Sequence, residues 1–121
     1  MSNYELPHLE EMEELPDILQ VEFHPWWNRK DLLAWCHERA VRMVAYSSLG
    51  GAGSGWLQEP YLMTLAESEG LTVAQLLLNW AVSQGVQVIP SARSAQHMSE
   101  NLACAWGLGE MEVVFTSDGR P

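Results

Sequence analysis

Arg93 is the first candidate for a functional residue, because it is the only Lys or Arg between positions 43 and 119. Ser94 follows it and can cap a helix, which would place a cation beside a helix amino terminus. This combination suits an anion such as a phosphate group. A surface arginine kept for solubility explains the same residue equally well. Arg93 is therefore a candidate anion ligand, with the surface role as its alternative.

Other kinds of site chemistry find little support in the sequence. The four histidines have no metal-ligand spacing, and no serine has the context of a hydrolase nucleophile. Residues 50–55 are rich in glycine but lack the Gly-Lys-Ser/Thr of a phosphate-cradling P-loop. Cys36 and Cys104 lie far apart in apolar helical contexts, which predicts buried reduced thiols and no disulfide.

The composition limits the classes of partner. The chain has 121 residues, a length typical of one domain, and its formal net charge is −10. Such a charge argues against nucleic acid and anionic membranes, because phosphate binds cations. No stretch approaches the ~20 apolar residues that span a bilayer, and residues 1–5 do not resemble a signal peptide. We expect a cytoplasmic protein that binds neither nucleic acid nor membrane.

Three apolar runs predict the strands that would position these residues, at 18–24, 43–47 and 86–89. Helices are expected at 6–15, at 31–39 with Asp31 able to cap, and from Pro60 towards Gly70. Thr72 and Gln75 form a capping-box pattern for a helix that reaches residue 85. Ser94 can open a last helix with Met98, Leu102 and Ala105, ended near Gly107.

This order of elements is typical of a parallel sheet with helical crossovers, so we predict an α/β fold. Residues 86–89 are apolar on both faces, as in a strand covered by helices. Three clear strands leave two open sheet edges, at which a protein partner could bind. We expect one domain over residues 1–113 that is part of a larger sheet, and a poorly ordered tail over 114–121.

Four segments, in this order, resemble the carboxy-terminal part of an aldo-keto reductase, a (β/α)8 TIM barrel that reduces carbonyls with NADPH. They are Ser2-Asn3-Tyr4, residues 20–25 (Gln-Val-Glu-Phe-His-Pro), residues 45–50 (Ala-Tyr-Ser-Ser-Leu-Gly), and residues 88–94 (Val-Ile-Pro-Ser-Ala-Arg-Ser) followed by Glu-Asn-Leu at 100–102. The resemblance reaches to about Val113 and implies a partial barrel, about the last three to four βα units, from a truncated chain.

The resemblance also implies contacts to an NADP(H) cofactor. Ser2, Asn3 and Gln20 would hydrogen-bond the nicotinamide carboxamide, whose donor and acceptor needs amide and hydroxyl side chains can meet. Tyr46 would stack on the nicotinamide ring. The remaining contacts would be Ser47, Leu49 and Gly50 at the pyrophosphate, under a flap formed by the loop through Gly55, and Ser91, Arg93, Ser94, His97, Glu100 and Asn101 at the adenosine end.

The preference for NADP over NAD follows from Arg93, which would pair with the 2′-phosphate. The commonest family pattern has Lys where this chain has Ser91, and Arg where it has His97. Ser91-Ala92-Arg93 is closer to the Gly-Ala-Arg of other branches.

The family's reaction uses an Asp, a Tyr, a Lys and a His from earlier strands, and the motifs that carry them do not occur in this chain. We therefore assign no catalytic residue and expect the chain to be inactive alone. The first hypothesis is an NADPH-dependent reductase of aldehydes and ketones, which would bind a carbonyl substrate if a complete barrel is formed. The second is a non-catalytic truncated isoform or degenerate copy that acts in interaction or regulation.

Overall fold

The structure is a computed structural model that describes residues 1–104. Its elements are α1 (Leu6–Glu10), β1 (Ile18–Glu22), α2 (Lys30–Glu38), β2 (Arg42–Tyr46), the 3-10 turn η1 (Trp56–Gln58), α3 (Pro60–Ser68), α4 (Val73–Ser83), β3 (Gln87–Val88) and α5 (Ala95–Ala103). The predicted helix end at Gly107 and the tail over 114–121 lie outside the described residues.

The strands form one parallel sheet, as predicted, and their order is β1-β2-β3. A further short segment runs beside β1: the backbone nitrogen of Asn3 donates to the carbonyl oxygen of Gln20 over 2.9 Å, and the nitrogen of Gln20 donates to that of Met1 over 2.8 Å. β1 is therefore not an edge strand, because this segment takes the edge position beside it. Four neighbouring chain segments run parallel, and the amino terminus lies at one edge of them.

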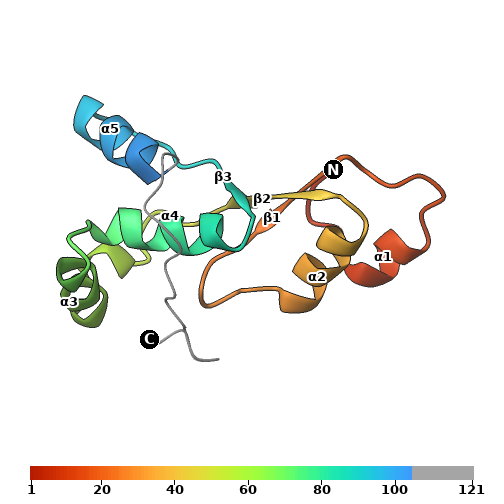
Figure 1. Cartoon of the computed structure of the whole chain (residues 1–121), viewed down its shortest axis with the longest axis horizontal. Helices are drawn as coiled ribbons and strands as arrows, with labels where there is room; N and C mark the ends of the chain where they lie inside the picture. The colour runs from red at the N-terminus through yellow and green to blue at the C-terminus, as the bar shows by residue number, and fades with distance from the viewer. Residues whose placement is uncertain (105–121) are drawn as a thin grey trace.

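Strand alternation divides the sheet into a buried face and a polar face. Leu19 pairs with Met43 and Val21 with Ala45, and all four side chains are buried in the core. Helices α1, α2 and α4 lie on one side of the strands (Figure 1). On the opposite face Gln20, Glu22 and Tyr46 remain only half-buried, and Val44, the partner of Gln20, is buried.

Helix caps follow the sequence in two cases and depart from it in one. Thr72 and Gln75 make both hydrogen bonds of the capping box at α4, with lengths of 3.1 and 3.2 Å, and Ser94 caps α5. At α2 the cap position is Arg29, in the left-handed region with φ 43°, and its side chain makes no cap bond. Asp31 is therefore not the cap. It lies in the first turn of α2, where its charge still favours the helix dipole.

Two elements are shorter than expected. The apolar run 86–89 yields only a two-residue β3, with Val86 buried and Ile89 53% exposed, because no described strand lies beyond β3 for Ile89 to pack against. Helix α1 ends at Glu10, where residues 10–14 contain four glutamates whose mutual repulsion opposes a longer helix.

Helix α5 also departs from the expected packing. Met98 and Leu102, which form its apolar stripe, are 58% and 61% exposed, and none of the residues of α5 is buried. This helix projects from the body of the molecule, in contact with α4 (Figure 1).

Cys36 and Cys104 are free and buried, as predicted. Burial raises the pKa of both thiols, so both remain protonated near neutral pH. None of the described helices is long and apolar enough to cross a membrane.

Candidate functional site

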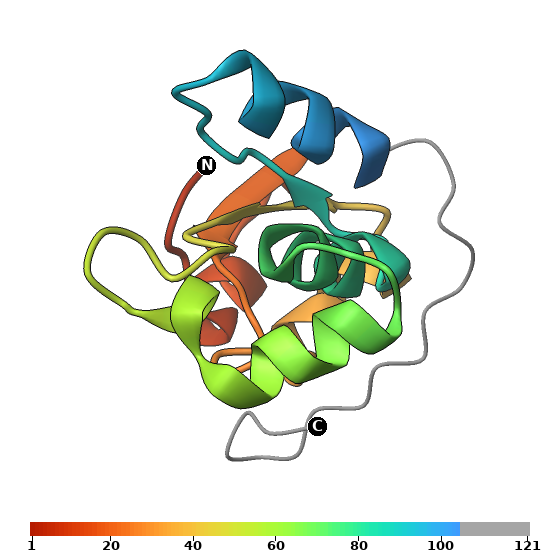
Figure 2. The same cartoon turned by 90° about the vertical axis from the view of Figure 1, so that its left-hand side faces the viewer.

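A pocket of about 590 Å³ opens between the loop after β2, the start of α4, the segment before α5 and one side of α5. Figure 2 shows this loop and the start of α5 on the same side of the molecule. The volume is typical of a small-molecule or cofactor site. Six of the residues singled out from the sequence line it: Leu49, Ser91, Arg93, His97, Glu100 and Asn101.

The pocket also has walls that the sequence reasoning did not assign. They are Leu57 and the first turn of α4, Thr72, Val73 and Ala74. The capping box at Thr72 was visible in the sequence, and it marks a helix amino terminus, which is a good place for an anion. That the turn faces Arg93 across a pocket depends on long-range packing of α4 beside α5, which no local pattern shows.

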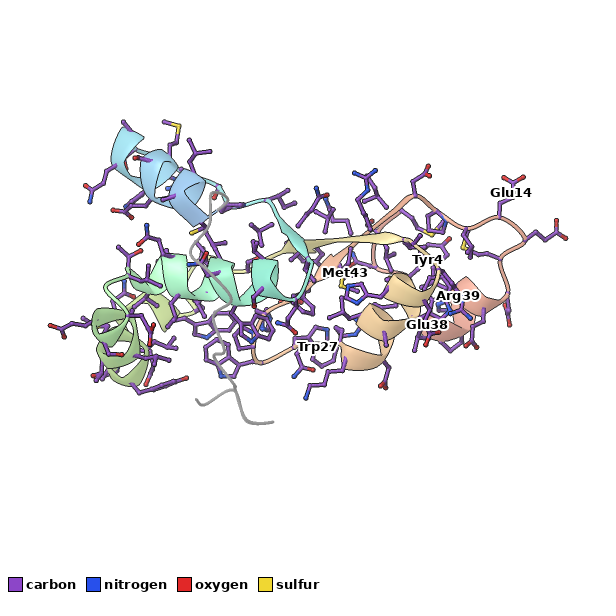
Figure 3. The ribbon with its side chains drawn as sticks, viewed as in Figure 1. Tyr4, Glu14, Trp27, Glu38, Arg39 and Met43 are labelled. Atoms are coloured by element: carbon purple, nitrogen blue, oxygen red, sulfur yellow. The ribbon has the colours of Figure 1, made fainter. Side chains whose placement is uncertain are left out.

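The electrostatics of the pocket favour an anion locally. Arg93 is exposed at its rim, and α4 begins there, so the positive end of one helix lines it. One acid, Glu100, also lines the wall. The acid-rich segment 10–17, which contains Glu14, lies at the other end of the molecule from α3 and α5 (Figures 1 and 3). The five acids of this segment are thus distant from the pocket.

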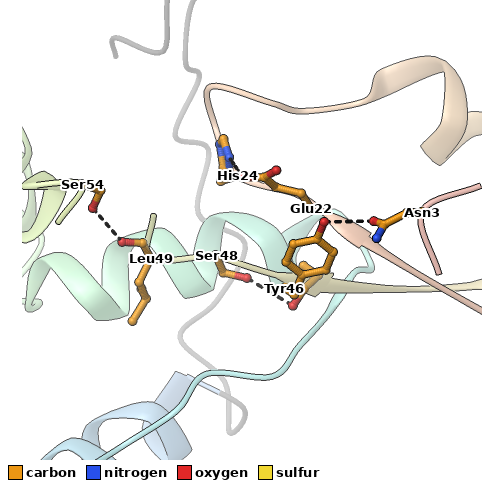
Figure 4. A network of polar contacts seen from close by, with 8 residues as sticks. Asn3, Glu22, His24, Tyr46, Ser48, Leu49 and Ser54 are labelled. Carbon is orange, nitrogen blue, oxygen red and sulfur yellow. Dashed lines mark hydrogen bonds and ion pairs between the residues drawn. The ribbon is translucent and has the colours of Figure 1, made fainter. Parts of the chain in front are cut away.

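A second group of predicted residues meets at the sheet. The hydroxyl group of Tyr46, the last residue of β2, donates to Oδ1 of Asn3 over 2.9 Å (Figure 4). Ser2 lies opposite Gln20 in a parallel bridge. The structure thus brings together one aromatic ring and a set of amide and hydroxyl side chains. This set can hold a planar ring and hydrogen-bond an amide substituent on it.

Ser47, Gly50 and Ser94, the remaining predicted residues, line neither group. Ser94 caps α5, and Ser47 takes a left-handed turn with φ 53° directly after Tyr46. The backbone nitrogen of Gly50 donates to the carbonyl oxygen of Ser47 over 2.8 Å. Ser47 and Gly50 shape the loop that leads from Tyr46 to the pocket through Leu49 (Figure 4).

Comparison with known proteins gives one consistent result. The model of the aldo/keto reductase family matches residues 1–106. The chain is 37% identical over 95 residues to the mouse aldo-keto reductase family 1 member A1, covering 72% of this chain and 29% of the mouse protein. It is 37% identical over 103 residues to rice deoxymugineic acid synthase 1, covering 80% of this chain and 32% of that protein.

Solved structures agree with the sequence matches. A Klebsiella pneumoniae aldo/keto reductase in complex with NADP and acetate superposes with a TM-score of 0.74 at 29% identity, covering 98% of this chain and 44% of that one. Another from the same organism, in complex with NADPH, gives 0.72 at 31% identity, covering 85% of this chain and 40% of that one. The predicted fold class, part of a (β/α)8 barrel, is confirmed. The chain spans about three tenths of the length of these curated relatives.

Proposed function

Because this chain belongs to the aldo/keto reductase family, we propose that its residues form the cofactor-binding part of an NADPH-dependent carbonyl reductase. The observation that carries the proposal is the pocket, which Arg93 lines together with the amino terminus of α4 and one side of α5. Two relatives of known structure were solved with NADP or NADPH, which supports the same cofactor here.

The pocket fits the phosphorylated end of the cofactor. The guanidinium group of Arg93 can make charge-assisted hydrogen bonds with a 2′-phosphate, and the first backbone N–H groups of α4 can donate to phosphate oxygens. Gly51 has φ 69° and lines the pocket without a side chain, which allows close backbone approach.

The group around Tyr46 fits the nicotinamide end. When bound there, NADPH would supply a hydride to a carbonyl carbon. The ring of Tyr46 would cover one face of the nicotinamide and leave the other face to the substrate. The side-chain oxygen of Asn3 accepts a hydrogen bond from the Tyr46 hydroxyl group, so the NH2 group of Asn3 remains to donate to the carboxamide. Gln20 on the neighbouring strand would provide a second amide contact.

The proton that carbonyl reduction also needs would come from outside this set of residues. The only lysine, Lys30, begins α2, and the hydroxyl group of Tyr46 is engaged by Asn3. We propose that the proton donor and the carbonyl substrate meet the nicotinamide where further strands complete the barrel. The two buried free thiols support a reducing compartment such as the cytosol.

Calorimetric titration of the full chain with NADPH and with NADH tests this proposal. The chain should bind NADPH more tightly than NADH. Arg93→Ala should weaken NADPH binding about tenfold, the loss of one charge-assisted hydrogen bond, and change NADH binding little. Arg42→Ala is the matched control, since Arg42 is an exposed cation at the first residue of β2, at the opposite end of this strand from Tyr46. Failure to bind either nucleotide, or equal losses in both arginine variants, would refute the proposal.

A further inference from the structure

We propose that Trp56 is a positioning residue for the cofactor: an aromatic clamp formed by Trp26 and His24 holds it, and it in turn fixes the glycine-rich loop, residues 50–55, at the pocket. This inference rests on the proposed function, because it assigns a role towards the same nucleotide. Trp56 itself lies outside the lining of the pocket, so it would act through its neighbours in the chain.

The clamp comes from the connection between β1 and α2. The ring of Trp26 stacks on that of Trp56 with centroids 4.2 Å apart and an angle of 27° between the planes. The ring of His24 meets Trp56 edge-on, at 4.7 Å and 69°. Offset stacking and edge-to-face contact are the preferred aromatic geometries. Two side chains that precede α2 therefore hold a side chain that lies far along the sequence, at the end of the glycine-rich loop.

His24 is itself held in place. It is only 7% exposed, and its Nε2 lies 3.2 Å from Oε1 of Glu22 (Figure 4). The contact with Glu22, the last residue of β1, therefore fixes the position of the His24 ring relative to the sheet.

The glycine-rich loop needs such an anchor. Four of its residues, Gly50, Gly51, Gly53 and Gly55, have positive φ, and glycine loses the most conformational freedom on ordering. The loop contacts Trp56 at two places. A Cβ atom added to Gly50 would lie 2.4 Å from the Trp56 ring, and Ser54 Oγ accepts from the backbone nitrogen of Trp56 over 3.4 Å. The rigid contact is thus placed at the carboxy-terminal end of a segment that has little stiffness of its own.

The anchored residues are those that reach the pocket. Gly51 and Ala52 precede Trp56, Leu57 follows it, and all three line the pocket. Without the clamp the loop would sample more conformations, and the cofactor would have to order it on binding. This entropic cost weakens the binding of a ligand that extends under the loop. The binding of a smaller ligand that contacts only Arg93 and α5 does not include that cost.

The test measures two ligands on the full chain by calorimetry, NADPH and adenosine 2′-monophosphate, which lacks the pyrophosphate. We expect Trp56→Ala to weaken NADPH binding at least fivefold and to leave the monophosphate unchanged. Trp56→Phe should recover most of the loss, since a phenyl ring can still stack. Trp27→Ala is the control, because Trp27 is 52% exposed and packs on Arg29 near the start of α2 (Figure 3).

A glycine pair tests the clamp with all tryptophans present. Gly50 and Gly53 have nearly the same φ, 85° and 84°, so alanine brings similar backbone strain at both. Only at Gly50 does the added methyl group strike Trp56, together with the Ser54 hydroxyl group that bonds to the Trp56 backbone, since nothing lies within 4 Å at Gly53. Gly50→Ala should therefore weaken NADPH binding more than Gly53→Ala. This pair decides the matter if Trp56→Ala does not fold.

Three results would overturn the inference: NADPH binding by Trp56→Ala equal to that of the unmodified chain, equal weakening of both ligands, or equal effects of the two glycine variants. Hydrogen exchange of the free chain separates this from failure of the proposed function. If the unmodified chain binds no NADPH, the proposed function fails. Faster exchange of residues 50–57 in Trp56→Ala than in Trp27→Ala would still support the clamp, and unchanged exchange would refute it.

Discussion

The Tyr46 hydroxyl group donates a 2.9 Å hydrogen bond to Oδ1 of Asn3, and these residues are 43 positions apart in the sequence. The bond ties the carboxy end of β2 to the segment beside β1, so it passes over the strand between them. It also orients the amide of Asn3, because the oxygen of that amide accepts the bond. One contact thus links the architecture of the sheet to the proposed nicotinamide contact.

Tyr46→Phe separates these two roles. The phenyl ring can still stack on the nicotinamide, so NADPH affinity should stay close to that of the unmodified chain. The free energy of unfolding should fall by about 0.5–1 kcal/mol with the lost hydrogen bond. Tyr46→Leu removes the ring as well and should cost about 1 kcal/mol of binding, about a fivefold loss. Urea unfolding and calorimetry measure the two effects, and equal affinities in both variants would remove Tyr46 from the site.

Local patterns predicted the elements that carry their own signal. The parallel strands at β1 and β2 followed from apolar runs, and α4 followed from Thr72 and Gln75, because capping and burial act over a few residues. The α2 cap was missed, since Arg29 adopts a left-handed conformation that its residue type does not suggest. The exposure of Ile89 was missed too, because it depends on which strand lies beside β3.

The candidate site divides in the same way. The residues at strand ends and after β3 came from motifs, and the structure gathers them into the pocket and the group around Tyr46. No motif predicted the α4 wall of the pocket or the stacking of Trp26 on Trp56, because both are contacts between segments distant in the sequence. Whether the thirteen named residues bind NADP(H) stays a prediction.

Thr72→Ala should destabilise the chain by about 1 kcal/mol. The substitution removes the hydroxyl oxygen that accepts from the Gln75 backbone nitrogen at the start of α4. The capping box then keeps only its second bond, from the backbone nitrogen of residue 72 to the Gln75 side chain. Thr64→Ala is the control: it removes a hydroxyl that only bonds back to Pro60 within α3. Thermal unfolding by circular dichroism measures both variants, and a control loss as large as that of Thr72→Ala would contradict the capping account.

Ala40→Gly should stabilise the chain by up to about 1 kcal/mol. Ala40 follows α2 with φ 55°, in the left-handed region where a Cβ atom is unfavourable and glycine is not. Ala34→Gly, on the exposed side of α2, should have the opposite sign, because glycine weakens a helix interior by a similar amount. Chemical unfolding of the two variants gives the comparison. A loss of stability in Ala40→Gly would show that the turn tolerates its present residue without strain.

The last prediction concerns the pH dependence contributed by His24. Its burial lowers the pKa of the imidazole, and the hydrogen bond and charge of Glu22 oppose this only in part. Because the folded pKa lies below the unfolded one, the unfolded chain binds the proton more readily. This contribution to stability is therefore fully present above about pH 6.5 and is lost as the pH falls below it, with a slope no steeper than about 1.4 kcal/mol per pH unit.

Urea unfolding at pH 7.5 and 5.5 checks this sign. The stability difference between the two pH values should be larger in the unmodified chain than in His24→Gln, which cannot titrate at this position. Glu22→Gln should increase the difference, since it removes the group that raises the His24 pKa. A smaller difference in the unmodified chain than in His24→Gln would mean that the Glu22 carboxylate, and not burial of the ring, dominates the titration of His24.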